Sequence, residues 1–474
     1  MVSKRQLIYG IGCCLFVIAS LWRKVDLKFM IIIVLWILLM GYCFLNYEKN
    51  IVTINFLITF FLFLLGGYFC SQYLGYNKNV VFFNDKITNH IYNALLLALM
   101  GIFCGIIGKF NLKLGQEKKE NKEYSKIIKQ ISKIGYFVTY FPYMLSGAFQ
   151  IFVSKSQGYE GIYLTDTSSM LPYWFRLVAY SCPVFFYLFL ATLPSKAEVR
   201  IPTFLFIIYT GITLMTGQRS TFVINIMLIL IYFVLRNNSN EKWIDKKLLL
   251  LLIAIAPIAI IGLNFIGYIR FKNESANYLS GIETLLDAFT SQGVSISVIG
   301  YGKFFEQMLP KKIYSFGGMI EFFKYNPITS IFYKFDSYSG QNVFRAMNGN
   351  LFSHAISYLV LPWGYVHGRG LGSCYIAEAY HDFGYIGVFL ISFVYGKILR
   401  FCNSFNKKSI MTRFIILNMQ YAILMAPRGL ADAFISNLFN IQIWIVLGSV
   451  IAISNILYWK NNEIRSGSKL TSSF

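Results

Sequence analysis

The segment FMIIIVLWILLMGYCFLNY, residues 29–47, runs for nineteen residues without a charged side chain. A helix of about 20 apolar residues crosses a hydrocarbon core about 30 Å thick. Inside lipid, only helices and closed barrels satisfy every backbone hydrogen-bonding group, and a barrel strand alternates apolar with polar residues. This run does not alternate. It therefore predicts a membrane-spanning helix.

Similar runs recur along the chain and decide the fold class. Of the 474 residues, 56% are hydrophobic and 14% are charged, and the mean hydropathy of +0.55 excludes an ordinary soluble protein. We predict an all-α polytopic integral membrane protein with about twelve transmembrane helices. The predicted spans are 6–22, 29–47, 51–75, 91–109, 135–154, 173–193, 203–217, 221–235, 248–268, 384–399, 411–427 and 434–458.

These spans divide the chain into four parts. Residues 1–268 form an N-terminal block of about nine spans, and 384–458 form a C-terminal block of about three. Between them, 269–383 form one large extracytoplasmic loop, while 459–474 form a basic cytoplasmic tail. Within the loop, spacing predicts amphipathic helices over 282–289 and 294–309, and an interfacial or re-entrant segment over 351–365 with Trp363 and Tyr365 at headgroup level.

The charge distribution indicates how the chain lies in the membrane. The formal net charge is +22, yet the large loop carries nine basic and eight acidic residues and is nearly neutral. The basic excess falls mainly in the predicted inner connections, as the positive-inside rule requires. We expect both termini to be cytoplasmic, with the Lys-rich run 109–133 against anionic lipid headgroups. No basic-aromatic soluble module points to nucleic acid.

Cysteine and acidic patterns argue against a metal or cofactor. Most of the eight cysteines fall inside predicted spans, and only Cys374 lies in the large loop, so no outer disulfide framework is available. The chain has no CxxC, no HExxH and no Asp-x-Asp motif. We therefore predict chemistry that needs neither a metal nor a cofactor.

Three arginines lie at predicted outer ends of helices, against the orientation trend. Arg219 sits in the connection MTGQRST, Arg270 follows the ninth span, and Arg428 sits in MAPRGLAD after the eleventh. Arginine is suited to bidentate binding of phosphate oxygens. The alternative for each is an interfacial arginine whose charged head reaches the headgroups.

A glycine-rich run, HGRGLGS (367–373), opens a predicted helix that carries Glu378, His381 and Asp382. Glycines let the backbone approach a ligand closely, and N–H groups at a helix start attract anions. Glu378 and Asp382 are four residues apart and share a helix face. The alternative is a glycine turn with helix-capping acids. The lone residues His354 and His367 are more typical of structural positions.

Together these features resemble the Wzy-type polymerases of O-antigen and capsular polysaccharide repeat units. The resemblance rests on the polytopic body, the single large loop, MTGQRST, and GRGLGSCYIAEAYHDFGYIG from Gly368 to Gly387. The spacing from Arg270 to Gly281 also matches an Arg-x10-Gly pattern found in some members.

This resemblance implies a metal-independent membrane glycosyltransferase. The donor would be a growing glycan on undecaprenyl pyrophosphate, and the acceptor a lipid-linked repeat unit at the outer face. Arg219, Arg270, Arg369 and Arg428 would bind pyrophosphate; Glu378 is the favoured base, with Asp382 and His381 as competitors. Membrane lipids, a chain-length regulator and a flippase are the expected partners. An O-antigen ligase-like transferase and a lipid-linked oligosaccharide flippase remain alternatives.

Overall fold

The computed structural model describes residues 25–108, 121–164, 171–216, 219–237, 241–245, 247–248, 251, 281–326, 329–332 and 340–471. Within these ranges the regular structure is entirely helical. The predicted span 6–22, most of 248–268, and Arg270 lie outside the described residues.

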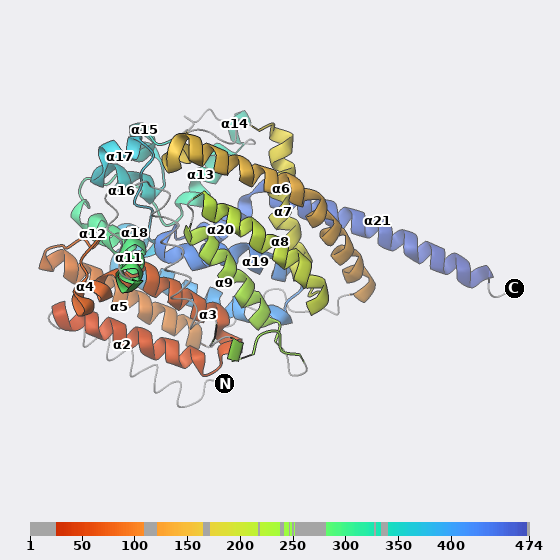
Figure 1. Cartoon of the computed structure of the whole chain (residues 1–474), viewed down its shortest axis with the longest axis horizontal. Coiled ribbons are helices and arrows are strands. Elements are labelled where there is room, and N and C mark those ends of the chain that lie inside the picture. The colour runs from red at the N-terminus through yellow and green to blue at the C-terminus, as the bar shows by residue number, and fades with distance from the viewer. Residues whose placement is uncertain are drawn as a thin grey trace. The chain divides into compact units, whose positions relative to one another are not determined.

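The helices follow one another along the chain with short connections (Figure 1). In order they are α2 (Val25–Phe44), α3 (Tyr47–Phe60), the π-helical turn η1 (Phe61–Leu65), α4 (Gly66–Leu74), α5 (Asp85–Ile107), α6 (Lys122–Leu164), α7 (Tyr173–Ala191), α8 (Lys196–Met215), α9 (Arg219–Leu235), α11 (Gly281–Gln292), α12 (Ser295–Phe304), α13 (Gly317–Tyr325), α14 (Thr329–Phe332), α15 (Val343–Asn348), α16 (Phe352–Val360), α17 (Pro362–Val366), α18 (Tyr375–Asn403), η2 (Phe405–Lys407), α19 (Ile410–Met425), η3 (Ala426–Arg428), α20 (Ala433–Ser436), η4 (Asn437–Phe439) and α21 (Ile441–Thr471).

These elements form two compact units, each described here by itself. The first unit comprises Met1–Leu112, Met227–Ser404 and Ala422–Phe434. The second comprises Lys113–Ile226, Phe405–Tyr421 and Ile435–Phe474. Every residue of the predicted large loop that the structure describes belongs to the first unit.

Glycines bring α5 and α18 together at the centre of the first unit, where Figure 1 shows the two helices side by side. A methyl group added at Gly105 would lie 2.3 Å from the carbonyl oxygen of Phe393, and one added at Gly396 would lie 2.3 Å from that of Ile102. Gly101, one turn before Gly105, faces α18 in the same way. Small residues four apart allow this backbone contact between membrane helices.

Helix α18 is the element that connects the membrane body to the large loop. It begins in the predicted loop at Tyr375 and runs to Asn403, interrupted at Gly384, whose φ of +63° lies outside the helical region. The helix predicted to carry Glu378, His381 and Asp382 after the glycine-rich run is confirmed. The first turns of α18 therefore carry Glu378, His381 and Asp382 on an element fixed to α5.

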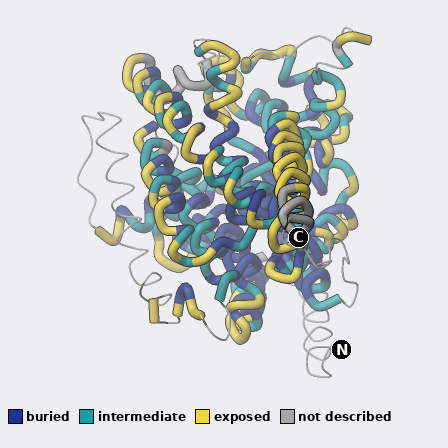
Figure 2. Tube along the Cα trace, turned by 90° about the vertical axis from the view of Figure 1, so that its right-hand side faces the viewer, coloured by how far each residue is buried: buried dark blue, intermediate teal, exposed yellow. Residues whose placement is uncertain are grey.

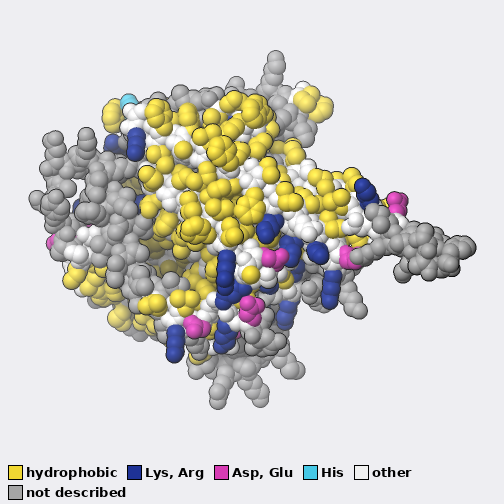
Figure 3. All heavy atoms as spheres, turned by 45° about the vertical axis from the view of Figure 1, so that its right-hand side comes forward, with side chains coloured by type: hydrophobic (Ala, Val, Ile, Leu, Met, Phe, Trp, Pro, Cys, Tyr) yellow, Lys and Arg dark blue, Asp and Glu magenta, His cyan; other side chains and the backbone are white. Residues whose placement is uncertain are grey.

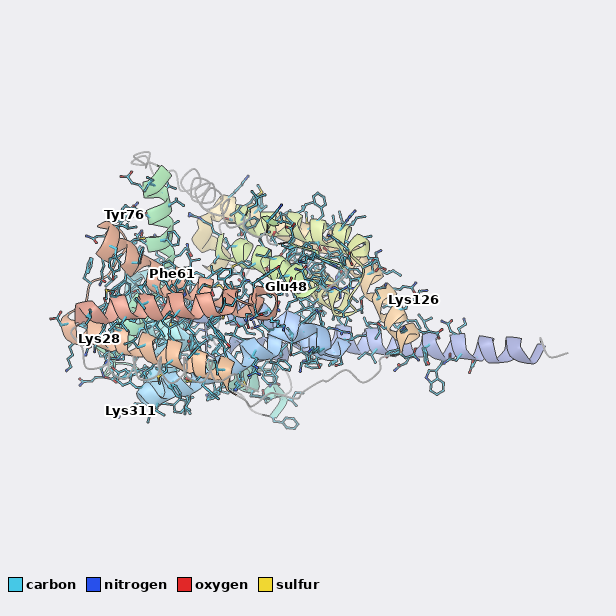
Figure 4. The ribbon with its side chains drawn as sticks, turned by 90° about the horizontal axis from the view of Figure 1, so that it is seen from below. Lys28, Glu48, Phe61, Tyr76, Lys126 and Lys311 are labelled. Atoms are coloured by element: carbon cyan, nitrogen blue, oxygen red, sulfur yellow. The ribbon has the colours of Figure 1, made fainter. Side chains whose placement is uncertain are left out.

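In the second unit, α6 shows the amphipathic character of a helix that meets both lipid and water. Its first turns carry Lys122, Lys126 and Lys129, while exposed apolar side chains such as Val138 and Phe141 follow. Lys126 is labelled in Figure 4, and Figure 3 shows a broad hydrophobic surface with Lys and Arg side chains along its border. The exposed residues of α21 form the mostly yellow helix near the C-terminus in Figure 2.

The described residues contain seven helices long and apolar enough to cross a membrane, and the shorter apolar helix α9. The seven match the predicted spans 29–47, 51–75, 91–109, 173–193, 384–399, 411–427 and 434–458. Segment 135–154 lies within α6, and residues 203–215 of the predicted span 203–217 lie within α8. The last span begins later than predicted, because short turns occupy 433–439 and the side chain of Asn440 accepts a hydrogen bond from the backbone of Gln442.

The helices expected inside the large loop are present as α11, α12, α16 and α17. Trp363 is 70% exposed, but the expectation that Tyr365 would also reach the headgroups is wrong. Tyr365 is fully buried and its hydroxyl hydrogen-bonds His354 Nδ1 at 2.9 Å. The spacing of apolar residues along the sequence does not show that the Tyr365 hydroxyl has a hydrogen-bond partner inside the protein.

We predict that Gly105→Ala destabilises the protein, because a methyl group 2.3 Å from a carbonyl oxygen forces α5 and α18 apart. Overpacking of this kind costs about 1–3 kcal/mol. The readout is the thermal unfolding midpoint of the purified protein in detergent. Gly41→Ala, on α2 of the same unit, is the matched control, since its added methyl group meets nothing within 4 Å. Equal midpoints for the two variants would contradict the close contact.

Candidate functional site

The glycine-rich segment 367–374 lies in the first unit, between α17 and α18. Gly368 and Gly372 have φ of +90° and +79°, a region that L side chains rarely adopt. Leu371 N–H donates to Ser357 Oγ at 2.9 Å, which ties the segment to α16. A methyl group at Gly372 would lie 3.7 Å from the carbonyl oxygen of Arg428. The segment therefore runs against the connection after the eleventh predicted span.

Glu378 joins three segments of this unit from a fully buried position. Its Oε1 accepts a hydrogen bond from Ser373 Oγ at 2.5 Å, at the end of the glycine-rich segment. Its Oε2 accepts one from the backbone N–H of Ala431 at 2.8 Å, in the connection after Arg428. Both oxygens of the carboxylate are thus occupied by protein donors, which suits a structural anchor.

Asp382 fixes a second loop and a histidine. Its carboxylate accepts backbone hydrogen bonds from Tyr314 at 3.0 Å and Ser315 at 2.7 Å, and its side chain is only 1% exposed. His381 Nδ1 lies 3.0 Å from Asp382 Oδ1, and the ring stacks edge-on with Tyr314. A carboxylate at Nδ1 fixes the tautomer that leaves Nε2 able to accept a proton. The structure therefore brings His381 and Asp382 together as a pair.

Arg428 is held from two sides. Its NH1 donates to Gln292 Oε1 at 2.8 Å, and its guanidinium carbon lies 5.6 Å from the ring centroid of Phe63. Phe63 belongs to the π-helical turn η1, whose first residue, Phe61, is labelled in Figure 4. Single π-helical turns are rare and are frequent at functional sites.

Two glycines make this arrangement of Arg428 possible. A methyl group at Gly293, the residue after Gln292, would lie 2.7 Å from the backbone nitrogen of Gly67 on α4. The backbones of α4 and the end of α11 are therefore in direct contact. This contact places the amide of Gln292 and the ring of Phe63 within reach of one guanidinium.

The other predicted arginines are placed differently. Arg369 is an exposed residue of the glycine-rich segment, and its backbone N–H donates to the carbonyl of Gly364 at 2.9 Å. Arg219 is the first residue of α9 and belongs to the second unit. Arg270 lies outside the described residues. Of the four, Arg369 and Arg428 lie on the two segments that meet near Gly372.

Both lone histidines of the loop have internal partners, as expected of structural residues. Burial and the nearby Arg345 lower the pKa of His354 to about 4. His367 stacks on Trp363 with ring centroids 4.2 Å apart, and its Nδ1 lies 2.7 Å from the carbonyl oxygen of Trp363.

Sequence reasoning missed two buried polar residues beside this site. Asp432 Oδ2 accepts the backbone N–H of Met319 at 2.8 Å, while its Oδ1 is buried without a hydrogen-bond partner. His90 on α5 is 4% exposed, and its Nδ1 lies 2.9 Å from the hydroxyl of Tyr385. Two features of the sequence could have identified them. Asp432 follows a proline that ends a predicted helix, and His90 is an ionisable residue in an apolar helix.

These features define a polytopic membrane protein in which Arg369, Arg428 and the His381–Asp382 pair lie on segments that buried carboxylates hold in place. The family model of the O-antigen polysaccharide polymerase Wzy matches residues 6–461, nearly the whole chain. The protein belongs to this family and is a surface-polysaccharide repeat-unit polymerase. Comparisons with curated proteins and with solved structures found no match.

We predict that lowering the pH from 7 to 5 stabilises the protein through Asp432. Burial raises the pKa of this carboxyl from 3.8 to about 6, so the folded state binds the proton more tightly and stability is lost as the pH rises from about 4 through 6. Between pH 7 and 5 this shift corresponds to about 1 kcal/mol of stability. Thermal midpoints at both pH values measure the effect. Asp432→Asn should reduce the difference between them, and an unchanged difference in the variant would contradict the assignment.

Proposed function

We propose that this polymerase transfers a growing glycan from undecaprenyl pyrophosphate to a lipid-linked repeat unit at the outer face of the bacterial inner membrane. The observation that carries the proposal is the family match over residues 6–461. The match also favours a polymerase over a ligase-like transferase or a flippase. The arginines near the glycine-rich segment provide the charge that a pyrophosphate substrate requires.

In the proposed reaction, a hydroxyl oxygen of the acceptor sugar forms a bond with the anomeric carbon of the donor glycan. The bond from that carbon to the pyrophosphate oxygen breaks, and its electron pair leaves with undecaprenyl pyrophosphate. The hydroxyl proton passes to a base of the protein. Guanidinium groups stabilise the charge that develops on the leaving group, so no metal is needed.

We assign pyrophosphate binding to Arg219, Arg270, Arg369 and Arg428. Arg428 supports this role best, because Gln292 and Phe63 fix its guanidinium, and its backbone carbonyl lies against the glycine-rich segment at Gly372. Arg369 is exposed on that segment and therefore accessible to a substrate. The assignments of Arg219 and Arg270 rest on the family resemblance and their positions in the sequence.

The geometry moves our preference for the base from Glu378 to His381. Both oxygens of Glu378 already accept hydrogen bonds, and the residue is fully buried. His381 is held by Asp382 in the tautomer whose Nε2 can take the acceptor proton. In this scheme Asp382 orients the base, and Glu378 maintains the segment on which Arg369 lies.

We also propose an orientation for the protein in the membrane and two partner proteins. Both termini would be cytoplasmic, because the basic excess falls in the predicted inner connections. A flippase would deliver the lipid-linked repeat unit to the outer face, and a chain-length regulator would act on the product. Only the large loop and the outer helix ends would then meet substrate.

We predict that Arg369→Ala abolishes chain extension while the protein remains in the membrane, because an exposed guanidinium contributes to substrate binding rather than to folding. Arg369→Lys should restore it in part, since lysine keeps the charge but loses the bidentate geometry. The measurement is the glycan ladder on a gel from a deletion strain carrying each variant. Lys311→Ala, which removes another exposed cation of the loop, is the control. A wild-type ladder from Arg369→Ala would remove this residue from the site.

We predict that His381→Asn lowers the initial rate of polymerisation by about 10²–10⁴, the usual contribution of a general base. Its thermal midpoint should stay close to that of the wild type. Glu378→Gln should instead lower the midpoint, because its single amide oxygen can accept only one of the two hydrogen bonds that Ala431 and Ser373 donate to the carboxylate. The reverse pattern, with Glu378→Gln stable but inactive and His381→Asn active, would identify Glu378 as the base.

A further inference from the structure

A group of three cations surrounds one carboxylate in the large loop, away from the residues assigned above. Glu321 and Lys324 lie on α13, Lys312 precedes that helix, and Arg345 lies on α15. All three cations interact electrostatically with Glu321. We call Lys312, Glu321, Lys324 and Arg345 the cationic cluster.

Arg345 is only partly satisfied by its neighbours. Its NH1 donates to the carbonyl of Gly340 at 3.1 Å, and its NH2 lies 3.9 Å from Glu321 Oε2, beyond hydrogen-bond distance. Its Nε is buried and has no hydrogen-bond partner in the structure. The side chain is nevertheless 21% exposed, so part of the guanidinium is accessible to a ligand while the protein satisfies its donors incompletely.

Gln341 provides a second unsatisfied group and connects the cluster to the glycine-rich segment. Its Oε1 is buried without a hydrogen-bond partner. A methyl group at Gly370 would lie 3.8 Å from its Nε2. The cationic cluster therefore lies beside the segment that carries Arg369.

The fold holds the cluster in place through short polar contacts. Asn342 caps α15 by accepting the backbone N–H of Arg345 at 2.8 Å. Asn350 donates its backbone N–H to Glu321 Oε1 at 2.9 Å and accepts a hydrogen bond from Lys324 Nζ at 3.1 Å. Lys312 Nζ donates to the carbonyl of Asn348. Three cations are thus oriented without being fully neutralised.

The net charge of the cationic cluster indicates which kind of ligand it can bind. Three positive side chains face one negative one, and His354 nearby is neutral at pH 7 because its pKa is lowered to about 4. The balance of two positive charges disfavours a metal cation. An oxyanion would receive charge-assisted hydrogen bonds from the exposed part of the Arg345 guanidinium and from the two lysines.

We propose that Lys312, Lys324 and Arg345 form a binding site for an oxyanion, a carboxylate or phosphate group, next to the glycine-rich segment. The site rests on the proposed function only for the source of this group, which would be an acidic sugar or the pyrophosphate of a lipid-linked substrate. With this site, the large loop would bind a negatively charged group of the substrate at a point separate from Arg428.

Calorimetric titration of the full-length protein tests the site directly. The protein is placed in nanodiscs of phosphatidylcholine, and inorganic pyrophosphate and glucuronate are titrated in separate experiments. Arg345→Gln and Lys324→Gln should each weaken binding of the accepted anion about tenfold or more. Lys311→Gln, which removes the exposed cation next to Lys312, should leave it unchanged.

Glu321→Gln is a control that distinguishes loss of the anion site from misfolding. This substitution keeps an oxygen that can accept the N–H of Asn350 but removes the negative charge, so it should tighten anion binding several-fold. Damage to the fold would weaken binding instead. Tighter binding in this variant therefore supports the site, and weaker or unchanged binding overturns it.

The remaining outcomes identify the source of the anion. Binding of pyrophosphate alone indicates a lipid-linked substrate, and binding of glucuronate indicates an acidic sugar. Weaker binding in nanodiscs that contain phosphatidylglycerol indicates that lipid headgroups occupy the same site. Equal anion binding by wild type and Arg345→Gln, or none by wild type, overturns the proposal. Because the assay compares wild type with variants of the cationic cluster and measures binding rather than chain extension, failure of this site is distinguishable from failure of the proposed function.

Discussion

The buried carboxylate of Glu378 is the contact on which the rest of the site depends. It joins the start of α18, the end of the glycine-rich segment through Ser373, and the connection after Arg428 through Ala431. Without it, two buried donors would lose their acceptor, at a cost of about 1–3 kcal/mol each. Helix α18 is fixed to α5 by backbone contact at Gly105 and Gly396. The carboxylate of Glu378 therefore fixes the glycine-rich segment and the connection after Arg428 to this pair of helices.

Similar carboxylate contacts recur through the loop and explain how a long connection acquires a defined shape. Asp382 binds the backbone at Tyr314 and Ser315, and Asp432 binds it at Met319. Acids that look catalytic in the sequence therefore serve first to hold irregular backbone inside the protein, where unpaired N–H groups are costly. His381 is the group that these contacts leave best placed for proton transfer. Arg428 is the assigned cation whose guanidinium is best fixed, by Gln292 and Phe63.

The sequence predicted the membrane class, the seven spans that the described residues contain and the helix that carries Glu378, because hydrocarbon thickness leaves a strong local pattern. It also singled out the segment 367–373 and the acids after it. It did not predict that Glu378 would be enclosed, that Tyr365 would turn inward, or that Arg345 would join Lys312 and Lys324. Those outcomes depend on which distant segments meet, and residue spacing along one helix carries no such information.

We propose that this chain forms glycosidic bonds in a transfer whose leaving group is a lipid pyrophosphate. The most direct measurement uses the purified protein in nanodiscs with labelled undecaprenyl pyrophosphate-linked repeat units and a metal chelator. We expect the glycan to lengthen, with one undecaprenyl pyrophosphate released for each bond formed. Folded protein that releases no undecaprenyl pyrophosphate and lengthens no glycan would contradict the account.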